Sequence, residues 1–125
     1  MWYRSNLPTG NLDRRFRSYF DIPNYNCVIK GFSASTHGGL ATYIRSDINF
    51  DIVDMPEHSG NVWESLYIQV YGASTGGRKL TMGNIYRPPR ERVELVDRFL
   101  DEFLTDLEFL DDHDSVYIFG DFNIM

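Results

Sequence analysis

The sequence predicts a mixed α/β (α+β) fold with a mostly antiparallel sheet and one long amphipathic helix. Short β-branched or alternating segments follow one another from residue 27 to residue 88. Apolar residues then recur at the spacing of a helix, and a short, strongly apolar segment follows. Antiparallel strands, one helix and a central strand form a layered architecture. Residues 1–125 are interpreted as one domain, because this length suits a single hydrophobic core.

Six strands are predicted from local patterns, after an N-terminal segment that is polar and irregular. They are expected at residues 27–32, 40–46, 48–54, 61–72, 79–88 and 115–120. Ser46 and Asp47 are expected to join the second and third strands in a hairpin. In the fourth strand, Leu66, Ile68 and Val70 alternate with more polar residues, so its two faces should serve different purposes. The short connections favour antiparallel pairing.

One long helix is predicted to begin near residue 93. Its apolar face is expected to carry Val93, Val96, Leu100, Phe103, Leu107 and Leu110, widened by Phe99 and Leu104. Pro88 and Pro89 precede the helix, where missing amide donors do little harm. Asp111, Asp112 and Asp114 should end it, because carboxylates oppose the dipole at a helix C-terminus. The apolar segment that follows is typical of a central strand buried on both faces.

Composition excludes several classes of protein. No apolar run approaches the ~20 residues that a membrane span needs, and the first ten residues lack the apolar core of a signal peptide. The single cysteine, Cys27, cannot form an internal disulfide, which favours a reducing, intracellular compartment. Cys27 lies at a predicted strand start and is interpreted as a small buried apolar residue rather than a reactive thiol.

The charge of the chain is unevenly distributed. The formal net charge is −6, but residues 1–90 carry a balance of +3 and residues 91–125 a balance of −9. The local field matters more to a charged ligand than the total does. The acidity is therefore assigned to the solvated face of the predicted helix, and the remainder of the chain stays compatible with a polyanionic partner.

Asp121 and Asn123 follow the last predicted strand and form a candidate site. Side chains two positions apart on a strand point the same way, so these two should face one side of the sheet. Ligands in open α/β sheets bind at the C-terminal ends of strands. A carboxylate and a carboxamide there could hold the outer shell of a hard cation and a phosphoryl oxygen. The alternative is a turn closed by Asx residues.

Tyr86 and Arg87 end the preceding strand, directly before two prolines. Tyrosine and arginine donors can contact phosphate oxygens without sequence preference. Because proline fixes the backbone, it should hold Tyr86 in one direction. A half-buried aromatic side chain is the alternative interpretation of Tyr86.

Four segments, in this order, resemble successive blocks of the endonuclease/exonuclease/phosphatase superfamily. They are closest to the apurinic-type endonuclease domains of non-LTR (LINE-type) retrotransposon polyproteins. The segments read GGLATYI, WESLYIQV, GNIYRPP and YIFGDFNI, and the resemblance extends over nearly the whole chain. It implies a four-layer α/β/β/α sandwich, of which this chain would be a part. It also implies Mg²⁺- or Mn²⁺-dependent hydrolysis of DNA phosphodiester bonds, and a nuclear location.

The resemblance assigns roles residue by residue. Asp121 matches the aspartate that orients or activates the attacking water, Asn123 the asparagine that binds the phosphate, and Tyr86 the tyrosine at the scissile phosphate. Glu64 matches an acidic position that has a supporting role in the family. The alternative interpretation of Glu64 is a charged side chain that points outward or pairs with a neighbouring strand. Arg87 and Arg90 are plausible backbone-phosphate contacts, with solvated arginines as the alternative.

Two departures limit the implied activity. Many relatives have an asparagine three residues after the tyrosine, where this chain has Pro89; the retrotransposon branch often has this Tyr–Arg–Pro–Pro form. The metal-binding glutamate and the closing Ser–Asp–His block of the family are not matched in the chain. Glu57 and Glu64 lie in the wrong segments to replace the glutamate. The three histidines, at 37, 58 and 113, are expected on the surface.

We therefore expect a piece of a nuclease domain, truncated at both ends relative to the family and nearly inactive alone. Its partner by resemblance is DNA, and no membrane association is expected. The sheet surface that faces missing layers should be exposed, which favours self-association. A non-catalytic remnant or interaction module and a phosphatase of the same superfamily stay open as alternatives.

Overall fold

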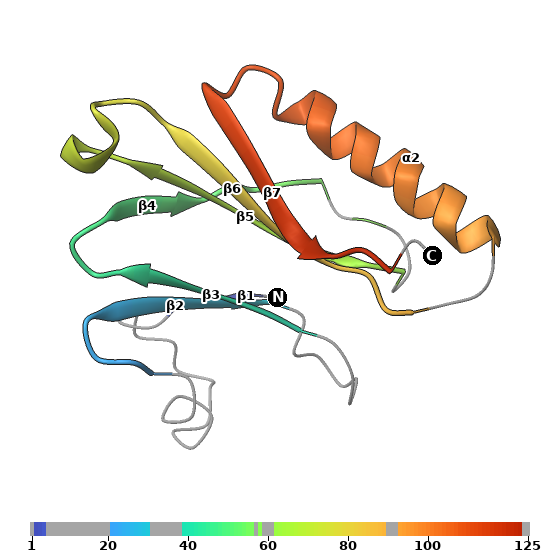
Figure 1. Cartoon of the computed structure of the whole chain (residues 1–125), viewed down its shortest axis with the longest axis horizontal. Helices are drawn as coiled ribbons and strands as arrows, with labels where there is room; N and C mark the ends of the chain where they lie inside the picture. The colour runs from blue at the N-terminus through green and yellow to red at the C-terminus, as the bar shows by residue number, and fades with distance from the viewer. Residues whose placement is uncertain are drawn as a thin grey trace.

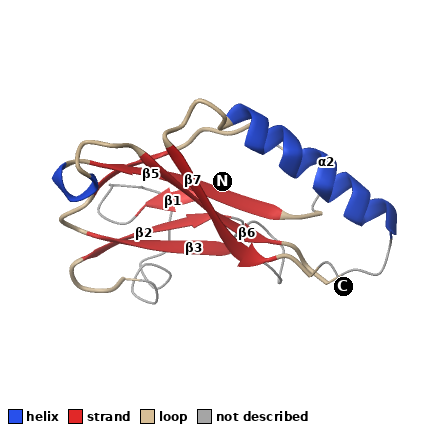
Figure 2. Ribbon diagram, turned by 45° about the horizontal axis from the view of Figure 1, so that its top comes forward, coloured by secondary structure: helices blue, strands red, loops and turns tan. Residues whose placement is uncertain are grey.

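The computed structural model describes residues 2–4, 21–30, 39–56, 58, 62–89 and 93–123. Within this part of the chain the fold is mixed α+β, with two sheets and one α-helix, and the sheets are mostly antiparallel. This confirms the prediction of a mixed α+β fold with mostly antiparallel strands and one helix. The four-stranded sheet lies between the helix and the three-stranded sheet (Figures 1 and 2).

The smaller sheet has the order β1-β2-β3, and all of its pairs are antiparallel. Its strands are β1 (Trp2–Arg4), β2 (Tyr25–Lys30) and β3 (Leu40–Arg45). The prediction of an irregular N-terminal segment is wrong for Trp2–Arg4, which pairs with Val28–Lys30. Three residues are too few to show a period, so only the partner strand reveals this one.

The larger sheet has the order β4-β5-β6-β7. Its strands are β4 (Asn49–Ile52), β5 (Glu64–Tyr71), β6 (Leu80–Tyr86) and β7 (Ser115–Asp121). A 3-10 turn, η1 (Ala73–Thr75), lies between β5 and β6, and helix α2 (Val93–Phe109) connects β6 to β7. β6 and β7 run parallel, which is why a helix is needed to return the chain to the start of the next strand.

The predicted hairpin at Ser46 and Asp47 is wrong. The short turn is present, with the amide of Ile48 donating to the carbonyl of Arg45, and Arg45 is paired with Asp47 at 2.6 Å. However, β3 pairs with β2 in one sheet and β4 pairs with β5 in the other. The turn therefore carries the chain from one sheet to the next instead of joining two neighbouring strands.

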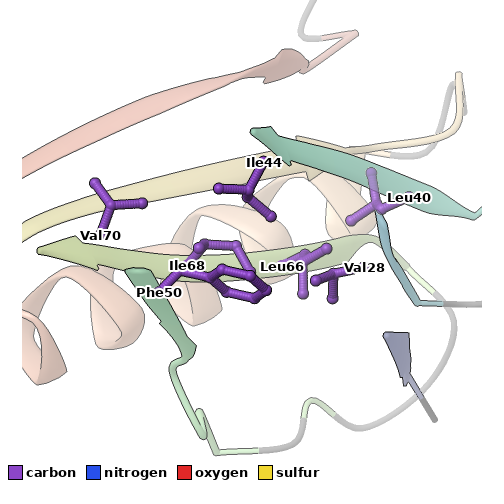
Figure 3. Packing of buried hydrophobic residues seen from close by; sticks show 7 residues of the cluster. All are labelled: Val28, Leu40, Ile44, Phe50, Leu66, Ile68 and Val70. Atoms are coloured by element: carbon purple, nitrogen blue, oxygen red, sulfur yellow. The ribbon is translucent and has the colours of Figure 1, made fainter. Parts of the chain in front are cut away.

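The first hydrophobic cluster holds the two sheets together. Its buried members come from both sheets and are Val28, Leu40, Ile44, Phe50, Leu66, Ile68 and Val70 (Figure 3). The prediction that the two faces of β5 serve different purposes is confirmed, since Leu66, Ile68 and Val70 pack in this cluster and Tyr67 of the other face packs in a second one. Burying one such side chain is worth about 1.5–3 kcal/mol, so this layer is a main source of stability.

A second cluster packs helix α2 against the other face of the larger sheet. It contains Val62, Trp63, Tyr67, Ile85, Phe99 and Leu110. The helix ends at Phe109, as the acidic residues after it predicted. The predicted apolar face is only partly right: Phe99, Phe103 and Leu110 join the cluster, while Leu100, Leu104 and Leu107 are exposed. The helix carries more apolar residues than one buried face can use, so spacing alone could not choose among them.

Strand β7 is neither central nor buried on both faces, which corrects that prediction. It lies at one end of the larger sheet. Val116 and Ile118 pack toward α2, whereas Tyr117 and Phe119 are 48% and 61% exposed on the opposite face, and Met82 of β6 is exposed as well. The described residues thus leave an apolar sheet surface and an unpaired strand edge.

Cys27 is buried in β2, as predicted, and burial raises the pKa of its thiol above the usual value. Among the described residues, no helix has the length and apolar character that crossing a membrane requires.

Candidate functional site

Three of the predicted site residues lie in one row across three neighbouring strands. The register pairs Glu64 of β5 with Tyr86 of β6, and Tyr86 with Asp121 of β7. Residues directly opposite each other on paired strands project from the same face of a sheet, with strands ~4.8 Å apart. The structure therefore brings Glu64, Tyr86 and Asp121 together on one face.

That face is the one turned toward the smaller sheet. Tyr86 packs against the first hydrophobic cluster and is half-buried. Glu64 is also half-buried, and its Oε2 accepts a hydrogen bond of 2.6 Å from the amide of Gly39 at the start of β3. Asp121 is exposed. The row thus begins at the margin of the space between the sheets and ends in solvent.

The row combines an acceptor with a donor. A carboxylate accepts hydrogen bonds or a proton, and a phenol can donate to an oxygen. Asp121 is open to solvent beside the half-buried Tyr86, so water can reach the carboxylate while the ring is held by packing. This arrangement can orient a water molecule at Asp121 and present a hydroxyl donor one strand away.

Asn123 does not continue the alternation of β7. The strand ends at Asp121, and Asn123 has a φ of 43°, in the left-handed region that asparagine tolerates. Its side-chain amide donates a hydrogen bond of 2.6 Å to the carbonyl oxygen of Arg87. Strand alternation therefore does not determine the direction of Asn123 relative to Asp121, because that rule holds only for extended residues.

Arg87 is 1% exposed, so the alternative of a solvated side chain is wrong, and a phosphate in solvent cannot reach it in this arrangement. Its backbone amide donates 2.9 Å to the carbonyl of Asp121. Its Nη1 donates to the carbonyls of Phe122 and Asn123, and its guanidinium lies 5.8 Å from the centre of the Phe99 ring. Together with the Asn123 amide, these bonds clamp the end of β6 to the end of β7.

Arg90, the second predicted phosphate contact, lies outside the described residues, as do His37 and Glu57. Of the six residues predicted for the site, the structure places three in the row and two in the clamp beside it.

A buried polar network between α2 and the larger sheet was missed by the sequence analysis. His58 was expected on the surface, but its side chain is 15% exposed. Its Nδ1 lies 3.0 Å from Glu102 Oε2, and its Nε2 lies 3.1 Å and 3.2 Å from the two oxygens of Asp106, with hydrogen-bond geometry at Oδ2. The imidazole also stacks on Trp63 at 4.5 Å.

Asp106 is the centre of this network. It is fully buried, and the hydroxyl of Tyr67 donates 2.9 Å to its Oδ2. Burial is the largest influence and raises the pKa of Asp106, although the hydrogen bonds from Tyr67 and His58 oppose it. Burial and the nearby carboxylate also raise the pKa of Tyr67. A signal was present in the sequence, since Asp106 follows Phe99 by seven residues and so shares its helix face.

His113 was also expected on the surface and is instead half-buried. Its Nδ1 lies 2.5 Å from the hydroxyl of Thr81, which is fully buried, and 3.4 Å from the side-chain nitrogen of Gln69. The imidazole therefore joins the end of the helical connection to β5 and β6, some distance along the strands from the row.

The described residues contain no group of three or more histidine, cysteine, aspartate or glutamate side chains that could hold a metal ion. Glu64 and Asp121 are separated by a whole strand, and Glu64 is bonded to Gly39. This donor set is too sparse for a complete metal site. Comparison of the chain with models of protein families, with curated proteins and with solved structures finds no match.

Proposed function

We propose that this chain is part of an endonuclease/exonuclease/phosphatase-type domain that hydrolyses DNA phosphodiester bonds. Within that superfamily we assign it to the DNA-nicking endonucleases of non-LTR retrotransposons. The observation that supports this best is the row of Glu64, Tyr86 and Asp121, whose register sets an acidic, a phenolic and a second acidic group side by side. The resemblance of the sequence assigns these same three positions to one site.

The arrangement of the layers supports the same proposal. The first cluster lies between two sheets and α2 covers the outer face of one of them. We interpret this as three layers of an α/β/β/α sandwich, with 1–125 as one partial domain and α2 as its amphipathic covering helix. The exposed residues Met82, Tyr117 and Phe119 lie on the same face as Tyr86, which is turned toward the smaller sheet, and further strands of that second sheet would cover them in such a sandwich.

The roles follow from what each side chain can donate or accept. Asp121 accepts the proton of an attacking water, and the hydroxyl of Tyr86 donates to a phosphoryl oxygen. Glu64 supports the row by holding Gly39. For Asn123 to bind phosphate through its amide, that amide must leave the carbonyl of Arg87. Arg87 serves to fix Asp121 and Asn123 rather than to touch the phosphate.

We include a divalent cation, Mg²⁺ or Mn²⁺, in the proposal only because the sequence resembles that of a metal-dependent family. When bound, such an ion stabilises the charge that develops on the phosphoryl group. The described residues do not make up a site for it, so the chemistry assigned to this chain is limited to orienting water and donating to phosphate. DNA as the substrate and the nucleus as the place of action likewise rest on the resemblance.

The 125-residue chain alone is expected to leave supercoiled plasmid DNA uncut beyond the rate in buffer, with Mg²⁺ present. Losing one member of a cooperating catalytic set costs orders of magnitude in rate, and here the metal donors are incomplete. The measurement is the fraction of nicked plasmid over time on an agarose gel. Nicking that Asp121→Ala abolishes would show that the described residues suffice for turnover, and nicking that survives Asp121→Ala would remove Asp121 from its role.

A non-catalytic role is the second candidate, and the clamp between Arg87 and Asn123 favours it. Two hydrogen bonds join Arg87 and Asn123, and a third joins Arg87 to the carbonyl of Phe122, which is how a structural corner is built. Under this alternative, Asn123→Ala lowers stability and leaves any interaction of the chain with DNA unchanged. Under the nuclease proposal, the same substitution weakens DNA contact as well.

A further inference from the structure

Helix α2 carries an apolar stripe that its packing against the sheet does not use. Val93, Leu100, Leu104 and Leu107 are 71%, 45%, 57% and 37% exposed. Their separations of seven, four and three residues place them on one face of the helix, in the pattern of a helix–helix seam. We call these four residues the outer stripe.

The outer stripe is distinct from the buried face of the same helix. Phe99 and Phe103 pack with Trp63 and Phe122 in the second cluster, and Asp106 completes that face. The inner face is thus filled by aromatic contacts and by the polar network. A single exposed leucine needs no explanation, but four aligned along one helix mark a surface suited to burial against a partner.

The exposed charges beside the outer stripe are acidic. Glu94, Asp97, Asp101 and Glu108 are exposed, and Asp97, Asp101 and Glu108 recur at four and seven residues beside the outer stripe. Arg98 is the one basic residue in the sequence of α2, and it is paired with Glu102 at 3.0 Å. The rim of the stripe is therefore acidic.

We propose that the outer stripe of α2 docks an amphipathic helical segment of another protein, whose apolar side is flanked by lysine or arginine. Apolar contact along the stripe supplies affinity, and basic side chains against Asp97, Asp101 and Glu108 supply orientation. A second copy of this chain would place acidic rim against acidic rim, and a nucleic acid would be repelled. This binding function is separate from the site on the other face of the larger sheet.

The length of the surface defines the partner. From Val93 to Leu107 the helix rises ~21 Å, at ~1.5 Å per residue. A matching segment therefore has about four helical turns, or ~15 residues, with apolar positions spaced at three and four.

The test uses the full chain and two synthetic helical peptides of ~16 residues. Both carry leucine at the seam positions; one is flanked by lysine and the other by glutamate. Calorimetry is expected to show one-to-one, saturable binding of the lysine peptide, weakened at least tenfold in the double variant Leu100→Gln, Leu104→Gln. The affinity should also fall as salt rises from ~0.05 M to ~0.3 M, because the rim charges become screened.

Phe109→Gln is the matched control, since Phe109 is 48% exposed on α2 but lies away from the outer stripe. It should leave the affinity for the lysine peptide unchanged. Four results would overturn the proposal: no saturable binding of the lysine peptide, equal binding of the glutamate peptide, equal loss in Phe109→Gln, or a dimer of the chain that the double variant dissolves. Circular dichroism of each variant confirms that α2 is retained, because all substituted residues are exposed.

Discussion

Replacing Gly120 by alanine is expected to destabilise the fold by about 3 kcal/mol or more. A Cβ at Gly120 would lie 2.0 Å from the carbonyl oxygen of Ile85, and this backbone atom cannot rotate away as a side chain could. Ile85 is the residue opposite Gly120 in the parallel pair of β6 and β7. The strands must separate at the position next to Tyr86 and Asp121, so the same substitution should disturb the row.

The measurement for Gly120→Ala is urea denaturation followed by circular dichroism. Phe119→Ala is the matched control, because Phe119 is the preceding residue of β7 and is mostly exposed. It should cost less than about 1 kcal/mol. Equal stability of Gly120→Ala and the parent chain would contradict the close approach of β6 and β7.

Replacing Asp106 by alanine is expected to cost about 3 kcal/mol, because removing one partner of a buried polar network leaves the others unpaired. The hydroxyl of Tyr67 and the Nε2 of His58 both lose their acceptor. Glu108→Ala is the matched control on the same helix, since Glu108 is exposed. Urea denaturation compares the two free energies of unfolding; a cost for Asp106→Ala no larger than for Glu108→Ala would contradict the network.

The same carboxyl gives a pH dependence with a definite sign. Because burial raises the pKa of Asp106, the folded chain binds its proton more tightly than the unfolded chain does. The contribution of Asp106 to the free energy of unfolding therefore falls as pH rises above the ordinary aspartate value of ~3.9. Asp106→Asn has no such proton, so its stability relative to the parent should improve as pH rises above about 4. A constant difference would contradict the raised pKa.

Local sequence patterns were sufficient to predict most strands and the helix. The alternation of Leu66, Ile68 and Val70 predicted a strand with two different faces, and the apolar period after Pro89 predicted the helix. Both signals are periods within one continuous segment, so they can be recognised without knowing which distant residues the segment packs against. The row at the strand ends could be proposed as well, since Tyr86 and Asp121 each occupy the C-terminal end of a strand.

Local patterns could not predict which strands pair with one another. A two-residue turn at Ser46 and Asp47 can join neighbours in one sheet or carry the chain to another, and only the partners of β3 and β4 decide. The N-terminal strand at Trp2–Arg4 is visible only through its pairing with β2. In both cases the deciding contacts lie far away in sequence.

The burial of polar residues could not be predicted from the sequence either. Arginine and histidine are usually exposed, but Arg87 is buried and His58 is mostly buried. Partners from distant segments accept hydrogen bonds from Nη1 of Arg87 and lie within 3.2 Å of both ring nitrogens of His58. The left-handed backbone at Asn123 broke the alternation on which its predicted direction rested. A polar residue can be placed only once its partners are known, whereas an apolar period is visible in the chain itself.

Glu64, Tyr86 and Asp121 are proposed to present one surface to a nucleic-acid phosphate. The most direct test is a ¹⁵N NMR titration of the chain with a short DNA duplex at constant Mg²⁺. We predict saturable shifts that are largest at the amides of Glu64, Tyr86 and Asp121 and reduced in Tyr86→Phe. Absence of saturable change at these three residues, or a maximum on α2 instead, would contradict the assignment of this row as a phosphate-binding site.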